Sequence, residues 1–136
     1  MPDTQAVQVA AGVVWREGRF LAAKRPEDKP MPGYWEFPGG KREQGESIDQ
    51  TLRRELCEEL GIECRVCVPW TSVIHAYPHM TVEVHFIHVT DFTGTPEARD
   101  GQELVWLSPE EARHYPFLPA DIQLVDRIRH PLTAGS

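Results

Sequence analysis

A single helix, predicted for residues 47–60, constrains the fold of this chain more than any other segment. Its apolar residues recur every four positions, and this spacing predicts one buried face. Ser47 can cap the first turn, and Gln50 three residues later completes a capping box. Gly61 stands where a left-handed C-terminal cap is expected. The buried stripe consists of Ile48, Leu52, Leu56 and Leu60.

Predicted strands precede and follow this helix. Short β-branched or alternating apolar runs, separated by Gly- and Pro-rich turns, are typical of strands. They cover residues 7–15, 19–24, 34–37, 64–68, 72–75, 82–90 and 104–107. A second capping box at Ser108 starts a short helix, and a last helix is predicted for about residues 121–129. This order predicts an α/β or α+β sandwich, in which helices cover a mixed sheet.

The length of 136 residues and the apolar content of 40% predict one domain, residues 1–136, with one hydrophobic core. Residues 131–136 are expected to form a frayed tail. The chain has no apolar run long enough to span a membrane and no secretory signal at its N-terminus. We therefore expect a cytoplasmic protein with no membrane partner. The sequence leaves open whether it is a monomer or a homodimer.

The net charge of −7 argues against a nucleic-acid partner. Affinity for DNA or RNA comes mainly from Lys and Arg contacts to phosphate. A protein of this charge that handles phosphate groups would be expected to use a cation as intermediary.

The three cysteines, Cys57, Cys64 and Cys67, include one CxxC pair. A structural zinc site needs about four ligands, and the chain has no second pair. Without a secretory signal, reduced thiols are expected. Buried or idle thiols are therefore favoured over zinc binding or redox chemistry.

Three glutamates on the first helix carry the functional signal. Glu55, Glu58 and Glu59 fall within a sector of about 100° that borders the apolar stripe. Like charges so placed repel each other, and Arg54 can pair with only part of them. A hard divalent cation such as Mg²⁺ can offset the rest, because Mg²⁺ prefers carboxylate oxygens, water and substrate phosphate.

The alternative is an ordinary amphipathic helix with charges at its polar boundary. The preceding Gly39-Gly40 pair shifts the balance toward a site. A glycine pair lets the backbone approach a phosphate or a metal closely, and it can point a carbonyl inward.

The segment from Gly40 to Ile62 resembles the Nudix box. The matching positions are Gly40, Glu46, Arg54-Glu55-Leu56, Glu58-Glu59 and Gly61-Ile62. Thr51 departs from the pattern, since the family often has a small apolar residue there. Residues 35–41 look like the approach to the box in MutT-type members. The resemblance implies a Nudix α/β/α sandwich.

By resemblance, the reaction is hydrolysis of a nucleoside triphosphate to monophosphate and pyrophosphate with Mg²⁺, or with Mn²⁺ in its place. The implied metal ligands are Glu58, Glu59 and the carbonyl of Gly39. Glu55 is either a third ligand or the base that activates water. Arg54 is expected to orient a glutamate. Glu46 either orients the metal shell or favours the helix N-terminus electrostatically.

Two further site residues are implied outside the box. An acidic group from the loop before Trp106 often completes the metal site in MutT-type enzymes. Asp100 aligns best with it, Glu103 is the competitor, and a solvated loop charge is the alternative. Arg25 corresponds to a residue that contacts nucleotide phosphates, although a lone arginine is more often a surface charge.

Asp121 is the residue outside the box that bears most on the choice of base. In MutT-type enzymes this position touches the base, and an ionised Asp would accept from an amino group such as cytosine N4. The alternative is an N-cap of the last helix. Further pocket candidates are Ala11, Glu36, Phe37 and Val84, of which Phe37 and Val84 are also candidates for the core.

The likeness is greatest to the subgroup that hydrolyses CTP, dCTP and 5-methyl-dCTP. It rests on residues 89–95, 104–112 and 118–122. Oxidised deoxynucleoside triphosphates are further candidate substrates in a nucleotide-pool role. One alternative is an 8-oxo-dGTP diphosphatase. Another, of a different class, is a Nudix-fold recognition module without catalysis, against which the intact glutamates and the negative charge argue.

Overall fold

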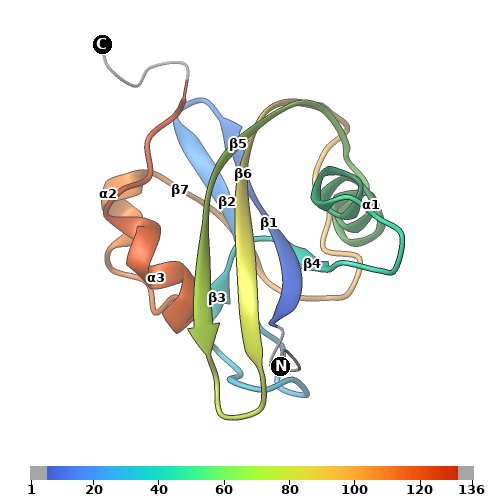
Figure 1. Cartoon of the computed structure of the whole chain (residues 1–136). Helices are drawn as coiled ribbons and strands as arrows, with labels where there is room; N and C mark the ends of the chain where they lie inside the picture. The colour runs from blue at the N-terminus through green and yellow to red at the C-terminus, as the bar shows by residue number, and fades with distance from the viewer. Residues whose placement is uncertain (1–5, 132–136) are drawn as a thin grey trace.

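The computed structural model describes residues 6–131, and these residues form a mixed sheet of seven strands (Figure 1). The strands are β1 (Val7–Arg16), β2 (Arg19–Lys24), β3 (Trp35–Glu36), β4 (Gly39–Lys41), β5 (Glu63–Ala76), β6 (Thr81–Thr93) and β7 (Leu104–Leu107). Five of them follow the order β3-β2-β1-β6-β5. In addition, β4 pairs with β1 and β7 pairs with β2.

The central pair, β1 and β6, is parallel. Its register runs from Val7 opposite Val82 to Val14 opposite Val89. A parallel pair needs a crossover connection, and the helix between the two strands supplies it. Because side chains alternate along a strand, β1 contributes side chains to both faces of the sheet. Ala10 and Val14 enter one apolar core, and Ala11, Val13 and Trp15 enter the other.

Helices cover both faces of this sheet (Figure 1). Helix α1 (Ile48–Leu60) lies on one face, where its stripe packs against the core of Ala10 and Val14. Helices α2 (Pro109–Ala112) and α3 (Pro119–Val125) lie on the other face. The predicted α+β sandwich with a mixed sheet is therefore confirmed.

Helix α1 is capped as the sequence predicts. Ser47 accepts a hydrogen bond from the backbone of Gln50, whose side chain returns one to the Ser47 backbone. Gly61 ends the helix with a left-handed φ of 73°. Thr51, the departure from the family pattern, is fully buried, and its hydroxyl donates to Glu46 at 2.9 Å. A polar residue is therefore accommodated there by a partner within the box.

Three elements differ from the prediction. Strand β5 is continuous, although two strands were predicted. Pro69 is tolerated because β5 lies at the edge of the sheet, and the pairing with β6 is irregular between Pro69 and Thr71. Helix α3 covers Pro119–Val125. It starts earlier than predicted because proline suits the first turn of a helix. Strand β4 was missed, since Gly39 and its neighbour were interpreted as a strand end.

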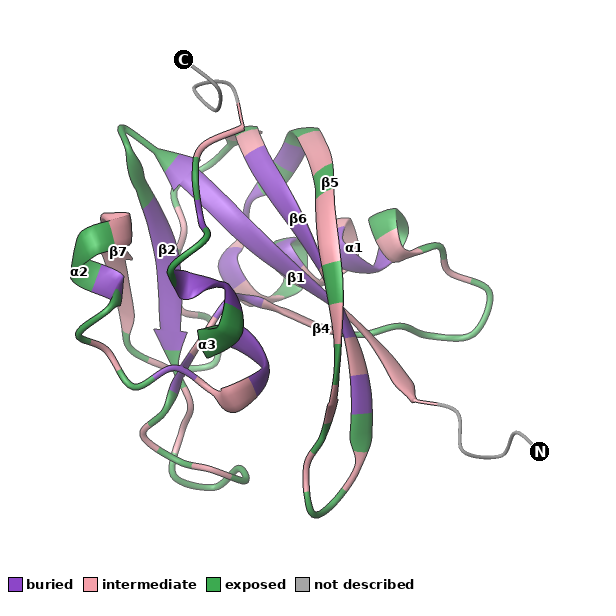
Figure 2. Ribbon diagram, turned by 60° about the vertical axis from the view of Figure 1, so that its left-hand side comes forward, coloured by how far each residue is buried: buried purple, intermediate pink, exposed green. Residues whose placement is uncertain are grey.

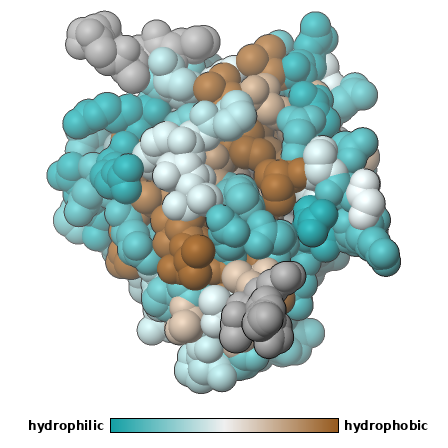
Figure 3. Space-filling model, in the orientation of Figure 1, coloured by the Kyte–Doolittle hydropathy of each residue, from teal (hydrophilic) through white to brown (hydrophobic). Residues whose placement is uncertain are grey.

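The strands in the middle of the sheet are the most buried. Buried residues concentrate in β1, β2 and much of β6, whereas the end of the β5–β6 hairpin is intermediate or exposed (Figure 2). On the face seen in Figure 3, small apolar areas are interrupted by hydrophilic side chains. Within residues 6–131 no helix is long and apolar enough to cross a membrane. Of the predicted tail, residues 131–136, only Pro131 is described, and residues 132–136 lie outside the described residues.

Candidate active site

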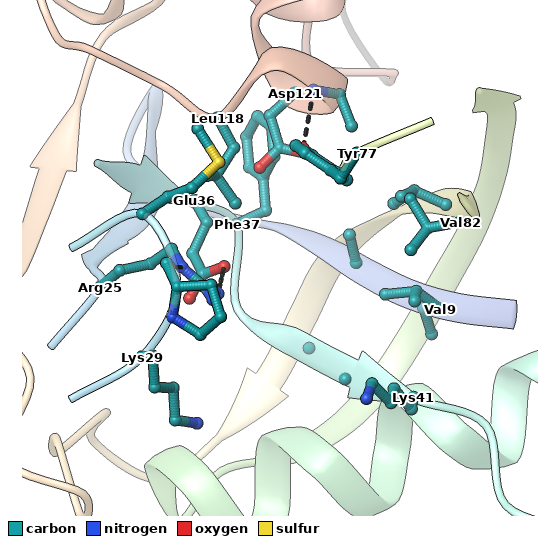
Figure 4. Close-up of a pocket in the computed structure, with 18 of the residues that line it drawn as sticks. Val9, Arg25, Lys29, Glu36, Phe37, Lys41, Tyr77, Val82, Leu118 and Asp121 are labelled. Carbon is teal, nitrogen blue, oxygen red and sulfur yellow. Dashed lines mark hydrogen bonds and ion pairs between the residues drawn. The ribbon is translucent and has the colours of Figure 1, made fainter. Parts of the chain in front are cut away.

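A cavity of about 600 Å³ extends from the first turn of α3 to the strand–helix junction at β4 and α1 (Figure 4). All six residues predicted to bind substrate line it: Ala11, Arg25, Glu36, Phe37, Val84 and Asp121. Gly39, Glu55 and Glu59 from the box region line its other end. Glu46, Arg54, Glu58 and Asp100 do not line it. The cavity therefore joins the predicted base-binding residues to two of the three glutamates.

The glycine pair at the start of β4 permits a close approach of backbone and side chain. Gly39 has a φ of 154°, and a Cβ placed on it would lie 1.9 Å from the carbonyl oxygen of Ala10 on β1. A Cβ on Gly40 would lie 2.4 Å from the carboxyl carbon of Glu55. Any larger residue would therefore push either β4 away from β1 or Glu55 out of its place.

Arg54 gathers four carboxylates around one guanidinium group. Its nearest ion pair is with Glu46 at 2.5 Å, and the others are with Glu55 at 3.0 Å, Glu58 at 3.3 Å and Glu43 at 3.7 Å. The hydrogen bond from Arg54 is the main cause that lowers the pKa of Glu46 to about 2. Arg54 thus contacts glutamates of the box, and it connects the loop before α1 to the helix.

Two glutamates of α1 lie in a less compensated environment. Burial is the main cause that raises the pKa of Glu59 to about 8, and the charges of Glu55, Glu36 and Asp100 raise it further. The backbone N–H of Gly39 donates to Glu59 at 3.3 Å and offsets part of this. Burial also raises the pKa of Glu55, although Arg54 opposes the shift. Ionisation of these two carboxyl groups is therefore unfavourable unless a positive charge lies beside them.

The predicted metal ligands are only partly brought together. Across residues 6–131, no three His, Cys, Asp or Glu side chains form a group that could hold a metal ion as they stand. The side chain of Glu58 is 61% exposed and pairs with Arg54. Asp100 is exposed but close enough to act on the pKa of Glu59, whereas its competitor Glu103 pairs with Lys24 at 4.0 Å.

The donor chemistry nevertheless fits a hard divalent cation. Glu55 and Glu59 offer carboxylate oxygens beside a glycine backbone that has no Cβ to block an ion. Hard cations prefer oxygen ligands of this kind, and a positive charge there would offset the repulsion between the two glutamates.

At the other end of the cavity, two acids and one arginine surround Phe37 (Figure 4). Arg25 donates to Glu36 at 3.0 Å and to the carbonyl oxygen of Pro30 at 2.7 Å. Asp121 is 5% exposed. Burial, followed by the charge of Glu36, raises its pKa well above the usual value, against a hydrogen bond from the Phe37 backbone. Burial therefore favours the protonated form of the Asp121 carboxyl.

The alternative of Asp121 as an N-cap is wrong. Leu118 occupies the N-cap position of α3 and makes no side-chain cap, while Asp121 lies in the first turn with its side chain buried at the cavity. Proline at the first helical position moved the start of α3 two residues upstream of the predicted start.

Sequence reasoning missed the cavity wall formed by the turn between β5 and β6. Tyr77, His79 and Met80 line the cavity, and the Tyr77 hydroxyl accepts a hydrogen bond from the backbone N–H of Ala120 at 3.0 Å. The sequence indicates a loop between two strands there. No local signal places that loop beside α3, because the contact spans more than forty residues of chain.

The fold and this arrangement of box residues define the class of the protein. Residues 10–127 match the family model described as NUDIX domain, and the chain belongs to the Nudix hydrolase family. The predicted likeness to its MutT-type members is confirmed by the relatives that follow.

One similar protein is the CTP pyrophosphohydrolase of Escherichia coli (strain K12), with 46% identity over 120 residues, which cover 88% of this chain and 89% of the relative. An 8-oxo-dGTP diphosphatase of Haemophilus influenzae is 34% identical over 127 residues, 93% of each chain. Among solved structures, a MutT Nudix hydrolase from Burkholderia pseudomallei superposes with a TM-score of 0.82 at 25% identity. That superposition covers 92% of this chain and 99% of the other.

Proposed function

We propose that the protein is a divalent-metal-dependent pyrophosphohydrolase that converts a nucleoside triphosphate to its monophosphate and pyrophosphate, with preference for a cytosine base. The observation that carries the proposal is the single cavity that has Glu55 and Glu59 at one end and Asp121 at the other. The 46% identity to a CTP pyrophosphohydrolase supports the same substrate class.

The glutamate end would hold Mg²⁺, or Mn²⁺ in its place, through Glu55, Glu58, Glu59, the Gly39 carbonyl and Asp100. Such an ion, when bound, screens phosphate charge and lowers the pKa of a bound water. Glu55 serves either as a ligand or as the base. A raised pKa suits a group that must accept a proton from water near neutral pH. The ion pair between Arg54 and Glu46 fixes the loop before α1 against the helix.

Three cations along the cavity can take up the negative charge of a polyphosphate. Arg25, Lys29 and Lys41 all line the cavity, with Lys41 on β4 near the glutamate end (Figure 4). Arg25 is already engaged with Glu36, so its position is fixed before any ligand binds. Arg25 is therefore proposed as a phosphate contact of defined orientation.

The buried acid at the other end favours particular base edges. A neutral carboxyl group offers one O–H donor and one carbonyl acceptor side by side. Cytosine presents its N4 amino donor beside the N3 acceptor, so that two hydrogen bonds can form with Asp121. The raised pKa therefore replaces the ionised, acceptor-only Asp121 of the sequence hypothesis with a group that matches two atoms of the base.

The second candidate substrate is 8-oxo-dGTP. Oxidation at C8 places a proton on N7, beside the O6 acceptor, and this edge also pairs with a neutral carboxyl. Unmodified guanine offers acceptors at both N7 and O6, and one of them would then lack a donor. The relative from Haemophilus influenzae supports this candidate.

Pyrophosphate release with Mg²⁺ tests the proposal. The panel is CTP, dCTP, 5-methyl-dCTP, 8-oxo-dGTP and dGTP. We expect the highest kcat/KM for a cytosine nucleotide and the lowest for dGTP. An excess of 8-oxo-dGTP turnover would favour the second candidate. Preference for dGTP would remove Asp121 from base recognition, and no release from any substrate, with tight oligonucleotide binding, would favour a recognition module.

A further inference from the structure

Two thiols lie together on β5, outside the cavity. Cys64 is 4% exposed and Cys67 is half-buried, and both pack against the apolar core beneath α1. Neither is engaged in a disulfide. The remaining cysteine, Cys57, is exposed on α1. The Nudix box does not include the pair, and the proposed reaction leaves it unused.

The backbone of β5 creates this proximity. In a regular strand, residues three apart point to opposite faces of the sheet. Between Cys64 and Cys67 the pairing with β6 shifts twice, on either side of Val66. Irregularities of this kind bend a strand and redirect its side chains. Both cysteines consequently pack against the same core, Cys64 within it and Cys67 at its partly exposed edge.

The two thiols are chemically unequal. The hydrogen bond from Cys64 is the main cause that lowers the pKa of Cys67, and Arg53 lowers it further. Conversely, its position as donor raises the pKa of Cys64. Arg53 is fixed beside the pair, because it donates to the carbonyl oxygen of Cys64 at 2.6 Å and to Asp49 at 2.7 Å. Low thiol pKa and partial exposure are the conditions for reaction with oxidants.

We propose that Cys64 and Cys67 form an oxidant-sensitive dithiol site, at which a hydroperoxide converts the pair to an intramolecular disulfide. The nearness of two thiols on one face of a bulged strand carries this proposal. It is an alternative to the sequence interpretation of buried or idle thiols, and it does not depend on the proposed function.

The chemistry balances in two steps. The Cys67 thiolate attacks one oxygen of the hydroperoxide, and the O–O bond breaks. The leaving oxygen takes up the proton that Cys67 gave up, and Cys67 becomes a sulfenic acid. The Cys64 sulfur then attacks the sulfenic sulfur, so that the S–O bond breaks and water leaves with the Cys64 proton. The two thiols are oxidised by two electrons and the hydroperoxide is reduced.

The test is treatment of the folded full chain with one equivalent of hydrogen peroxide at neutral pH. We expect the intact mass to fall by two hydrogen atoms and two of the three thiols to disappear. Proteolysis should yield one peptide cross-linked between Cys64 and Cys67, and dithiothreitol should restore both thiols. A mass that does not change, or a cross-link through Cys57, would overturn the proposal.

Matched variants assign the two roles. Cys57→Ser is the control and should form the disulfide at the wild-type rate. Cys67→Ala should lower the rate of thiol loss by about tenfold or more, because the reactive thiolate is gone. Cys64→Ala should leave Cys67 as a sulfenic acid that a dimedone probe traps. If the buried Cys64 variant does not fold, the Cys67→Ala rate decides, and an unchanged rate contradicts the proposal.

Discussion

An arginine is ion-paired with a carboxylate near each end of the cavity, but only Arg54 lowers the pKa of its partner, because burial outweighs Arg25 and raises the pKa of Glu36. Each end has one arginine and several carboxylates, and in each the arginine is bound to an outer carboxylate. Arg54 forms an ion pair with Glu46, whose pKa is lowered to about 2. Arg25 forms an ion pair with Glu36. The inner acids, Glu59 and Asp121, are left with raised pKa values because burial outweighs the compensation.

The two ends differ in the kind of partner that each can bind. At the glutamate end a cation can enter beside exposed acidic groups, and its charge would favour the ionised forms of Glu55 and Glu59. The Asp121 carboxyl is buried beside Phe37 in the first turn of α3, and burial favours its protonated form. One end therefore suits a metal–phosphate partner, and the other suits a neutral heterocycle.

The largest expected effect is at the glutamate end. Glu59→Gln removes a carboxylate that would bind the cation but keeps the size of the side chain. We expect kcat for pyrophosphate release to fall by about 10³-fold, which corresponds to several kcal/mol of metal-assisted stabilisation. Thermal unfolding should show an intact fold. Glu110→Gln, an exposed glutamate on α2, is the control. A wild-type rate in Glu59→Gln would show that Glu59 takes no part in metal-assisted hydrolysis.

An intermediate effect is expected at the other end. A carboxyl with a raised pKa destabilises the fold as the pH rises above its unfolded value, because the unfolded chain ionises more readily. Asp121→Asn removes this penalty and keeps one donor and one acceptor. We expect the free energy of unfolding at pH 7 to increase, because the asparagine has no proton to lose.

Chemical denaturation at pH 7 and pH 4 measures this increase. The gain should shrink toward pH 4, where the wild-type carboxyl is protonated in more of the unfolded molecules. Asp126→Asn, an exposed acid just after α3, is the matched control and should change stability little. A loss of stability in Asp121→Asn would show that Asp121 is ionised in the fold.

The smallest expected effect concerns acid stability at the glutamate end. Because the pKa of Glu46 is lowered, its contribution is complete above its unfolded pKa and is lost as the pH falls through about 2. Wild-type Tm should therefore fall more steeply between pH 4.5 and 2 than the Tm of Glu46→Gln. Equal slopes in thermal melts would mean that Arg54 contributes no stability through Glu46.

Local patterns predicted helix α1 and the box, and distant contacts decided what was missed. The caps and the apolar stripe of α1 lie within sixteen residues of chain, so the sequence alone was sufficient. The position of Tyr77 in the cavity wall depends on the approach of α3 to the β5–β6 turn, which no local signal encodes. The raised pKa of Asp121 depends on its burial in the folded chain. The packing of Cys64 and Cys67 on one face depends on the irregular pairing of β5 with β6, which the local sequence also does not encode.

The parallel pairing of β1 with β6 also has a consequence for how the molecule folds. Partner residues in this pair, such as Val7 and Val82, lie 75 positions apart (82 minus 7), whereas the β5–β6 hairpin closes between Ala76 and Thr81. Contacts between distant segments carry a large loop-closure entropy and form slowly. We therefore expect the hairpin and α1 to form first, and the cavity, whose walls need β1, to be among the last parts to assemble.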